Sequence, residues 1–520
     1  MPVERRYYSV KPANNIEASR TILIATALAV QLLFIIGFII WFYQYFIVFY
    51  SISILISIIA VLWILNNNSN PAYKIAWIIA IMLFPVFGGL SYLFLGGKKT
   101  GRMMKKRMRS ITHKTINSLI TMPGILKSIQ IQNDNAGNQA RYIQKYSYYP
   151  PYLNYYAVYL PSGESKFQRL KEELIKAENF IFLEYFIIEE GLMWNSILEI
   201  LQDKASCGVD VRVIYDDVGC LNKLPYNYCR NLENMGIKCG VFNPLSPILS
   251  SRLNNRDHRK IAIIDGHTGF TGGINLADEY INVVNKYGYW KDASIMLKGQ
   301  AVWSLTVMFL SVWDNIKGTE ENTELFRNLN GSEPMNCSDG YVQPFGDSPL
   351  DDEPVGEGVY LNLINKAKNY IYITTPYLIL NNEMVTALCL AAKGGVDVRI
   401  ITPHHADRWF VHTVSRSYYH ILVESGVKVY EYVPGFIHSK TFVVDDEFGI
   451  VGTINMDYRS LYLHFECAIW LYRCSCILDI KRDFQETVEV SREITLEDLK
   501  KIPWPKALIR SLLRVFAPLM

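Results

Sequence analysis

Hydrophobic positions are concentrated near the start of the chain. From Thr21 to Tyr73 there is no Asp, Glu, Lys or Arg. A helix needs roughly 20 apolar residues to cross a bilayer, so this stretch is long enough for two crossings, whereas the apolar part of a signal peptide is shorter. A buried core helix is the alternative reading. The pattern predicts transmembrane helices at about 21–43, 44–65 and, after a polar break, 75–95.

The remainder of the chain alternates strand-like and helix-like segments, and it does so twice. The segment AENFIF at 177–182 recurs as AKNYIY at 367–372. GVDVRV at 208–213 recurs as GVDVRI at 395–400. Offsets of 190 and 187 residues indicate a duplicated domain, because solenoid repeats have periods of roughly 20–50 residues.

Each copy contains short apolar runs of strand length that alternate with helical patterns. This alternation predicts a duplicated α/β fold, in which each copy is a layered α/β/α sandwich and the two copies are related by a pseudo-twofold axis. The expected strands lie at 180–187, 211–215 and 237–242 in the first copy, and at 370–374, 398–402 and 427–432 in the second.

These patterns divide the chain into five parts, with a connector rich in acidic residues, Pro and Gly at about 331–358. The expected parts are an N-terminal tail (1–20), transmembrane segments (21–96), a basic juxtamembrane linker (97–150), a first domain (151–335) and a second domain (336–520).

Charge is also segregated. The whole chain carries +3, yet residues 98–114 contain eight basic side chains and no acidic one, and residues 115–520 carry −8. Basic residues after a membrane span mark the cytoplasmic side and attract anionic lipids; a solvated charged helix is the alternative. We therefore expect a multi-pass protein of the cell membrane with cytoplasmic catalytic domains. The negative remainder argues against a nucleic-acid partner. The nine cysteines include no C-x-x-C pair and predict reduced thiols.

The chemically informative residues lie in two copies of one motif, H-x-K-x4-D. Side chains two apart on a strand share a face, so each copy presents an imidazole and an ammonium together. An Asn follows each His by 17 residues, after a small, turn-forming segment. The motif residues are His258, Lys260 and Asp265 in the first copy and His438, Lys440 and Asp445 in the second; the asparagines are Asn275 and Asn455.

If the two copies pair, their motifs form one pocket that suits a phosphodiester. One imidazole can attack phosphorus while the other protonates the leaving oxygen. Lys and Asn side chains can hold the phosphoryl oxygens, so we expect neither a metal nor a cofactor. His404-His405 with Asp407 could suggest a metal site, but no third ligand follows at zinc spacing, and we expect a loop near the pocket mouth. The other histidines, His464 among them, belong to no motif and are interpreted as ordinary.

With these paired motifs the chain resembles the phospholipase D superfamily over about 151–520. Its predicted membrane-spanning segments at 21–96, followed by the basic stretch at 98–114, resemble bacterial cardiolipin synthases in particular. The further segments that carry this resemblance include Glu184-Tyr185-Phe186, Trp290-Lys291-Asp292, Asp457-Tyr458-Arg459-Ser460 and Phe465-Glu466.

The resemblance implies transfer between two phosphatidylglycerol molecules, giving cardiolipin and glycerol through a phosphatidyl-histidine intermediate. It implies that His258 attacks phosphorus, that His438 acts as acid and then base, and that Asp292 and Glu466 orient the imidazoles. Phosphatidylglycerol and anionic membrane lipids would be the partners.

Two alternatives stay open. A membrane phospholipase D, or a phosphatidyltransferase with a different alcohol acceptor, would carry the same motifs. A nuclease of the same superfamily is the other, and the apolar segments and the −8 remainder count against it.

Overall fold

The computed structural model describes residues 46–67, 70–92, 116–119, 123–153, 156–245, 254–327, 339–350 and 353–519, with isolated positions at 26–40 and 113. The basic side chains of 98–114 and most of the segment expected at 21–43 lie outside these residues. The next two segments are helical, as α2 (Phe46–Asn66), α3 (Pro71–Leu83) and α4 (Pro85–Ser91). Among the described residues, no helix has both the length and the apolar character that crossing a membrane requires.

The first half of the catalytic region is built on a seven-stranded mixed sheet. Its strand order is β2 (Tyr156–Leu160), β9 (Ser294–Lys298), β7 (Thr268–Gly272), β6 (Lys260–Ile264), β3 (Phe180–Tyr185), β4 (Asp210–Asp216) and β5 (Lys238–Phe242). The associated helices are α8 (Gly163–Ile175), α9 (Leu192–Ser206), α10 (Tyr228–Asn234) and α11 (Val302–Lys317).

The second half repeats this plan on a nine-stranded sheet. Its order is β1 (Tyr152–Leu153), β10 (Tyr341–Asp347), β17 (Glu466–Tyr472), β16 (Phe448–Gly452), β15 (Thr441–Val444), β11 (Tyr370–Thr374), β12 (Asp397–Pro403), β13 (Lys428–Tyr432) and β18 (Ser491–Ile494). Its helices are α12 (Val355–Lys366), α13 (Asn382–Lys393), α14 (Trp409–Ser415), α15 (Tyr419–Glu424), α16 (Tyr458–Tyr462), α17 (Cys476–Glu489), α18 (Leu496–Lys500) and α19 (Trp504–Val515).

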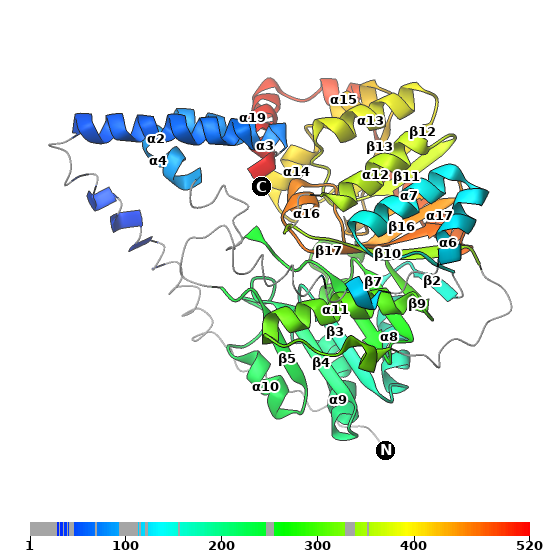
Figure 1. Cartoon of the computed structure of the whole chain (residues 1–520). Coiled ribbons are helices and arrows are strands. Elements are labelled where there is room, and N and C mark those ends of the chain that lie inside the picture. Colours follow the sequence, from blue (N-terminus) through cyan, green and yellow to red (C-terminus); the bar gives the residue numbers. More distant parts are fainter. Residues whose placement is uncertain are drawn as a thin grey trace, which may run out of the picture.

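Figure 1 shows the two halves stacked on one another, with the first half in green and the second in yellow to orange. One apolar core joins the two sheets: Phe182 and Trp313 of the first half belong to the same buried cluster as Tyr372 and Phe484 of the second. Separate outer cores lie under α8 and α9 and under α12 and α13. The shared inner core makes the two halves one unit and holds their facing strand ends in a defined relation.

The structure differs from the expected parts at two places, one before the first half and one between the halves. Residues 123–146, expected in the juxtamembrane linker, form α6 (Pro123–Gln132) and α7 (Asp134–Tyr146). Their buried apolar side chains belong to the outer core of the second half, under α12 and α13. The stretch expected as a connector contains β10, which pairs with β17 inside the second sheet. Both segments are short and polar enough to resemble a linker, and only packing reveals their place.

Candidate active site

The two H-x-K-x4-D motifs meet where the two halves face each other. Each histidine precedes a central strand, β6 or β15, and is anchored by a backbone bond to the other half. The amide of His258 donates to the carbonyl of Phe465 at 2.9 Å, and that of His438 donates to the carbonyl of Lys291 at 2.7 Å. A small sheet of β8 (Tyr289–Lys291) and β14 (Gly435–Ile437) reinforces the second of these contacts.

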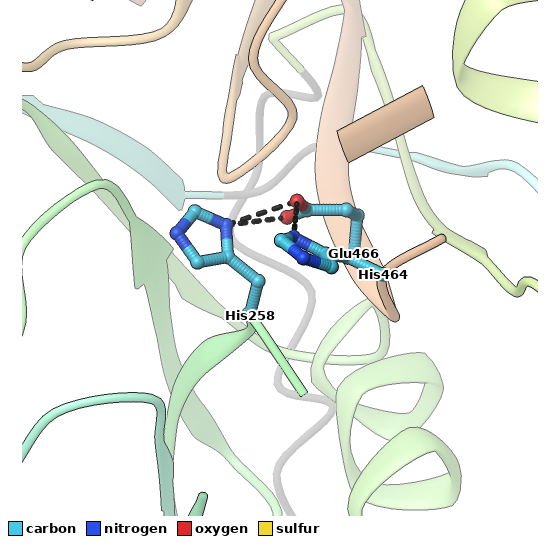
Figure 2. A group of neighbouring side chains, drawn as sticks. All are labelled: His258, His464 and Glu466. Carbon is cyan, nitrogen blue, oxygen red and sulfur yellow. Dashed lines mark hydrogen bonds and ion pairs between the residues drawn. The ribbon is translucent and has the colours of Figure 1, made fainter. Parts of the chain in front are cut away.

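Each imidazole is held by a carboxylate from the opposite half. His258 Nδ1 lies 2.9 and 3.0 Å from the two carboxylate oxygens of Glu466, and His438 Nδ1 lies 2.7 Å from Asp292 Oδ2. Both carboxylates are fully buried. With Nδ1 donating to a carboxylate, the Nε2 atom of each ring keeps a lone pair, and Figure 2 shows Nε2 of His258 pointing away from Glu466.

The motif lysines lie beside their histidines, as two residues on one strand face should. The ammonium group of Lys260 donates to the backbone oxygen of His258, and that of Lys440 donates to the backbone oxygen of His438. Both lysines are buried, and burial lowers the pKa of Lys260 to about 8 and that of Lys440 to about 7. Such poorly solvated cations interact strongly with an incoming anion.

The same environment keeps both imidazoles uncharged. Burial, and then the charges of Lys260 and Lys440, hold the pKa of His258 well below its usual value. Burial and Lys440 lower the pKa of His438 to about 4, against the opposing effect of Asp292. Neutral imidazole is the form that can act as nucleophile or base.

The two asparagines are also buried at the site, but they are used differently. The Asn275 oxygen accepts from the amide of Ile187 at 3.0 Å, and its amide group donates to the Tyr280 hydroxyl at 2.6 Å. The side-chain oxygen of Asn455 has no hydrogen-bond partner among the described residues. Asn275 is therefore committed to its neighbours Ile187 and Tyr280, whereas the side chain of Asn455 takes part in none of the hydrogen bonds between described residues.

The structure does not bring the motif aspartates to the histidines. Asp265 lies in the turn after β6, roughly 20 Å of extended chain from His258. Its carboxylate accepts from the amides of residues 178, 179 and 180 at 2.7–2.8 Å, and Asp445 binds those of residues 368, 369 and 370 in the same way. Asp265 and Asp445 fasten the start of β3 and β11, at positive φ values of 50° and 52° that Asp tolerates.

His464, which belongs to no sequence motif and was expected to be ordinary, lies at the site. The His464 ring centre lies 5.6 Å from that of His258, and its Nδ1 lies 3.7 Å from Glu466 Oε1. Burial lowers the pKa of His464 to about 3, so the ring is neutral. Its position two residues before Glu466, the first residue of β17, was the available signal.

His258, His464 and Glu466 also form the group whose ligand atoms, all within 4.8 Å of one another, could hold a metal ion in the described part of the chain (Figure 2). Two imidazoles and a carboxylate suit zinc chemically. However, Nδ1 of His258 and the carboxylate are already joined by the hydrogen bond that orients the ring. A metal at this position would compete with that bond, so the residues fit an orienting network better than a metal centre.

Comparison with known proteins agrees with this geometry. The family described as "Cardiolipin synthase, PLD-like domain" matches residues 170–287 and 360–488, and "Phospholipase_D-nuclease N-terminal" matches 55–97. A cardiolipin synthase of Alkalihalophilus pseudofirmus is 35% identical over 87% of this chain and 90% of that protein. The chain belongs to the cardiolipin synthase family of the phospholipase D superfamily. It is accordingly a phospholipase D-type phosphatidyltransferase.

Two further relatives extend the picture of this cardiolipin synthase family member. An uncharacterized protein of Streptococcus mutans is 43% identical over 89% of this chain and 99% of its own length. The crystal structure of phosphatidylserine synthase from Haemophilus influenzae aligns with a TM-score of 0.54 at 17% identity, covering 73% of this chain and 97% of that one. The latter likeness shows the shared fold of the duplicated catalytic region.

Proposed function

We propose that this chain joins two phosphatidylglycerol molecules into cardiolipin and releases glycerol. The observation that carries the proposal is the pair of neutral imidazoles, each oriented through Nδ1 by a carboxylate from the opposite half. When two such imidazoles share one buried site, one can act as the nucleophile and the other can carry the proton. Cardiolipin synthases among the relatives support the choice of lipid.

In the first step, Nε2 of His258 attacks the phosphorus of the donor lipid. A P–N bond forms, the P–O bond to glycerol breaks, and His438 gives its Nε2 proton to the departing oxygen. His438 gains that proton as the anionic substrate enters, because the bound phosphodiester offsets the lysine charges that hold its pKa low. Lys260, Lys440 and the amide group of Asn455 stabilise the negative charge that builds on the phosphoryl oxygens.

In the second step, His438 accepts the proton of the terminal hydroxyl of a second phosphatidylglycerol. That oxygen attacks the phosphohistidine, the P–N bond breaks, and the new P–O bond completes cardiolipin. Both enzyme groups return to their starting state, so no oxidant, metal or nucleotide enters the balance.

The direct test supplies labelled phosphatidylglycerol to the purified full-length protein and identifies the lipid products. We expect cardiolipin and one free glycerol per turnover. Phosphatidic acid as the main product would favour a phospholipase D that uses water. A matched sample with His258→Ala controls for contaminating activity.

We further propose that the N-terminal part and α19 attach the protein to a membrane. The α2 helix exposes Ile52, Leu55 and Leu62 among other large apolar residues, each at least half exposed. Near it, α3 contacts α19, which exposes Trp504 and Leu512. Exposed apolar side chains gathered in one region mark an interaction surface, and lipid is the substrate here.

We also propose that the chain crosses the membrane more than once and that its catalytic domains lie on the cytoplasmic side. The basic stretch 98–114 supports this orientation. Single cysteines introduced at each end of a cysteine-free variant, labelled with a membrane-impermeant reagent in intact cells, would test it. Protection of the C-terminal cysteine is the expected result. Its labelling from outside would exclude the proposed orientation.

A further inference from the structure

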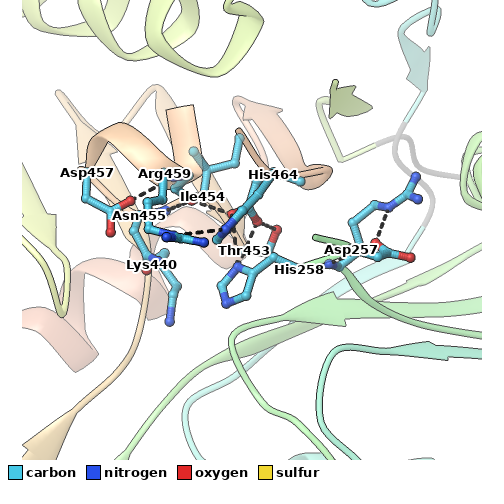
Figure 3. Close-up of polar contacts among 12 residues, drawn as sticks. Asp257, His258, Lys440, Thr453, Ile454, Asn455, Asp457, Arg459 and His464 are labelled. Atoms are coloured by element: carbon cyan, nitrogen blue, oxygen red, sulfur yellow. Dashed lines mark hydrogen bonds and ion pairs between the residues drawn. The ribbon is translucent and has the colours of Figure 1, made fainter. Parts of the chain in front are cut away.

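Arg459 is a cation that lies next to the active site. It lies on α16, and its Nε donates to Nε2 of His464 at 3.4 Å (Figure 3). None of the ion pairs between described residues includes its guanidinium. The neighbouring carboxylate of Asp457 caps α16 instead, by accepting from the amide of Ser460 at 2.8 Å.

Other positive charges gather around this arginine. Burial lowers the pKa of Arg459, and the nearby guanidinium groups of Arg408 and Arg256 lower it further, against the effect of Asp457. A partly buried cation among like charges is unfavourable in the empty protein. An anion placed there would relieve both the repulsion and the desolvation.

The fold itself does not require a cation at this position. Arg459 follows His438 by 21 residues, and the residue that follows His258 by 21 is Glu279. Glu279 lies 3.8 Å from Lys223 and 3.6 Å from Lys286, in an ordinary ion-pair cluster. The unpaired cation therefore belongs to one half alone, where the two halves otherwise share their plan.

Arg459 is also connected to the reacting group. Its partner His464 stands between it and His258, with ring centres 5.6 Å apart, and faces Glu466 with Nδ1. The donor phosphate is met by the two motif lysines, so the arginine is available for a second anion close by. The acceptor lipid carries such an anion, because its attacking hydroxyl and its own phosphate sit at the two ends of one glycerol.

We propose that Arg459 binds the phosphate of the acceptor phosphatidylglycerol and thereby selects this alcohol over water. The inference rests on the proposed function and adds a specificity-determining residue to it. Guanidinium binds phosphate oxygens through paired hydrogen bonds, and water or a simple alcohol offers nothing for it to bind. Positioning the hydroxyl through its own phosphate makes transfer faster than hydrolysis.

The test measures how one phosphohistidine intermediate is divided between acceptors. Arg459→Gln and Arg459→Lys are assayed in mixed micelles with labelled phosphatidylglycerol and added ethanol, and cardiolipin, phosphatidylethanol and phosphatidic acid are quantified together. We expect Arg459→Gln to lower the ratio of cardiolipin to the other two products about 10–100-fold, which is the range of a lost charged hydrogen bond. Arg459→Lys should fall between it and the unmodified protein.

The ratio separates this proposal from its alternatives, since all three products arise from one intermediate and a general loss of activity leaves it unchanged. Arg473→Gln, which removes an exposed arginine paired with Glu447, is the matched control and should not move the ratio. An unchanged ratio in Arg459→Gln would overturn the proposal. Absence of cardiolipin from the unmodified protein would instead overturn the proposed function. If Arg459→Gln fails to fold, Arg459→Lys alone decides by the same ratio.

Discussion

The surroundings of the two active-site histidines differ although the fold around them repeats. Around His438 the neighbours are aromatic, with ring centres of Trp290 at 5.4 Å, Tyr280 at 5.8 Å and Phe436 at 6.1 Å. Around His258 the ring centres of Phe186 and His464 lie at 5.1 and 5.6 Å, and behind the His464 ring lies Arg459. His438 thus lies among three aromatic rings, whereas His258 lies between one aromatic ring and a second imidazole that is backed by a cation.

The orienting carboxylates differ in the same sense. The carboxylate of Glu466 accepts from the hydroxyl groups of Thr453 and Ser460 as well as from His258. Asp292 accepts from the backbone amide of Ala293 at 2.7 Å. Gly273 takes the place of Thr453 in the first half, because a Cβ atom there would lie 2.0 Å from Asp292 Oδ1. The two halves share one backbone plan, but they differ in the residues around each histidine, as at Gly273 and Thr453. These differences support unequal roles for the two histidines.

The largest expected effect comes from removing the histidines one at a time. On phosphatidylglycerol, His258→Ala should lower kcat by about 10⁴-fold or more and His438→Ala by about 10²–10⁴-fold. A nitrophenyl phosphodiester needs little acid catalysis, so on it His438→Ala should still give a burst of phenol and an acid-labile phosphoryl adduct. His258→Ala should give neither. The reverse pattern would exchange the roles, and a burst from the double variant would remove histidine as the nucleophile.

Replacing the orienting carboxylates should lower kcat slightly less than removing the histidines. These variants test whether each carboxylate orients the histidine of the opposite half. Glu466→Gln and Asp292→Asn should each lower kcat about 10²–10⁴-fold on phosphatidylglycerol, because the imidazole loses its orientation and preferred tautomer. On the nitrophenyl substrate, Glu466→Gln should suppress the burst whereas Asp292→Asn should retain it. If Asp292→Asn suppressed the burst and Glu466→Gln retained it, the result would contradict the observed pairing of His258 with Glu466.

The lowered pKa values of Lys260 and Lys440 predict that activity is lost as the pH becomes moderately alkaline. Their folded-state pKa values of about 8 and 7 mean that the cationic form is lost as pH rises through this range. We expect kcat/KM to fall about tenfold per pH unit between about pH 7 and 8 and about a hundredfold per unit above about pH 8, since kcat/KM reports groups of the free enzyme and both lysines lose their charge in turn. Lys440→Arg keeps its charge and should remove the part of the decline that Lys440 causes. Full activity up to pH 10 would contradict the lowered values.

The smallest effect on chemistry is expected at the motif aspartates, where both halves are alike. Asp265→Ala leaves three backbone amides without their acceptor and should lower the free energy of unfolding by about 1–3 kcal/mol. The kcat of the folded fraction should stay within about twofold. Asp445→Ala should behave in the same way, as measured by denaturant unfolding and active-site titration. A loss of kcat as large as that of the histidine variants would return these residues to the chemistry.

The sequence by itself determined the repeated architecture and most of the pocket. Apolar runs of strand length predicted strands that the structure places at β3, β4 and β5 and at β11, β12 and β13. The i, i+2 spacing of His and Lys correctly placed them together, because side-chain direction on a strand is a local property. The resemblance to the phospholipase D superfamily could also be recognised from the sequence, because the paired motifs that carry it are local patterns.

Tertiary structure decided what local patterns do not contain. The pairing of His258 with Glu466 and of His438 with Asp292 depends on how two sheets dock across a shared core. Asp265 shares a motif with His258 yet lies at the opposite end of the strand, since spacing along the chain does not state which end faces the partner. Arg459 has no motif, and only the absence of an ion pair with it among the described residues, a property of packing, distinguishes it from other arginines.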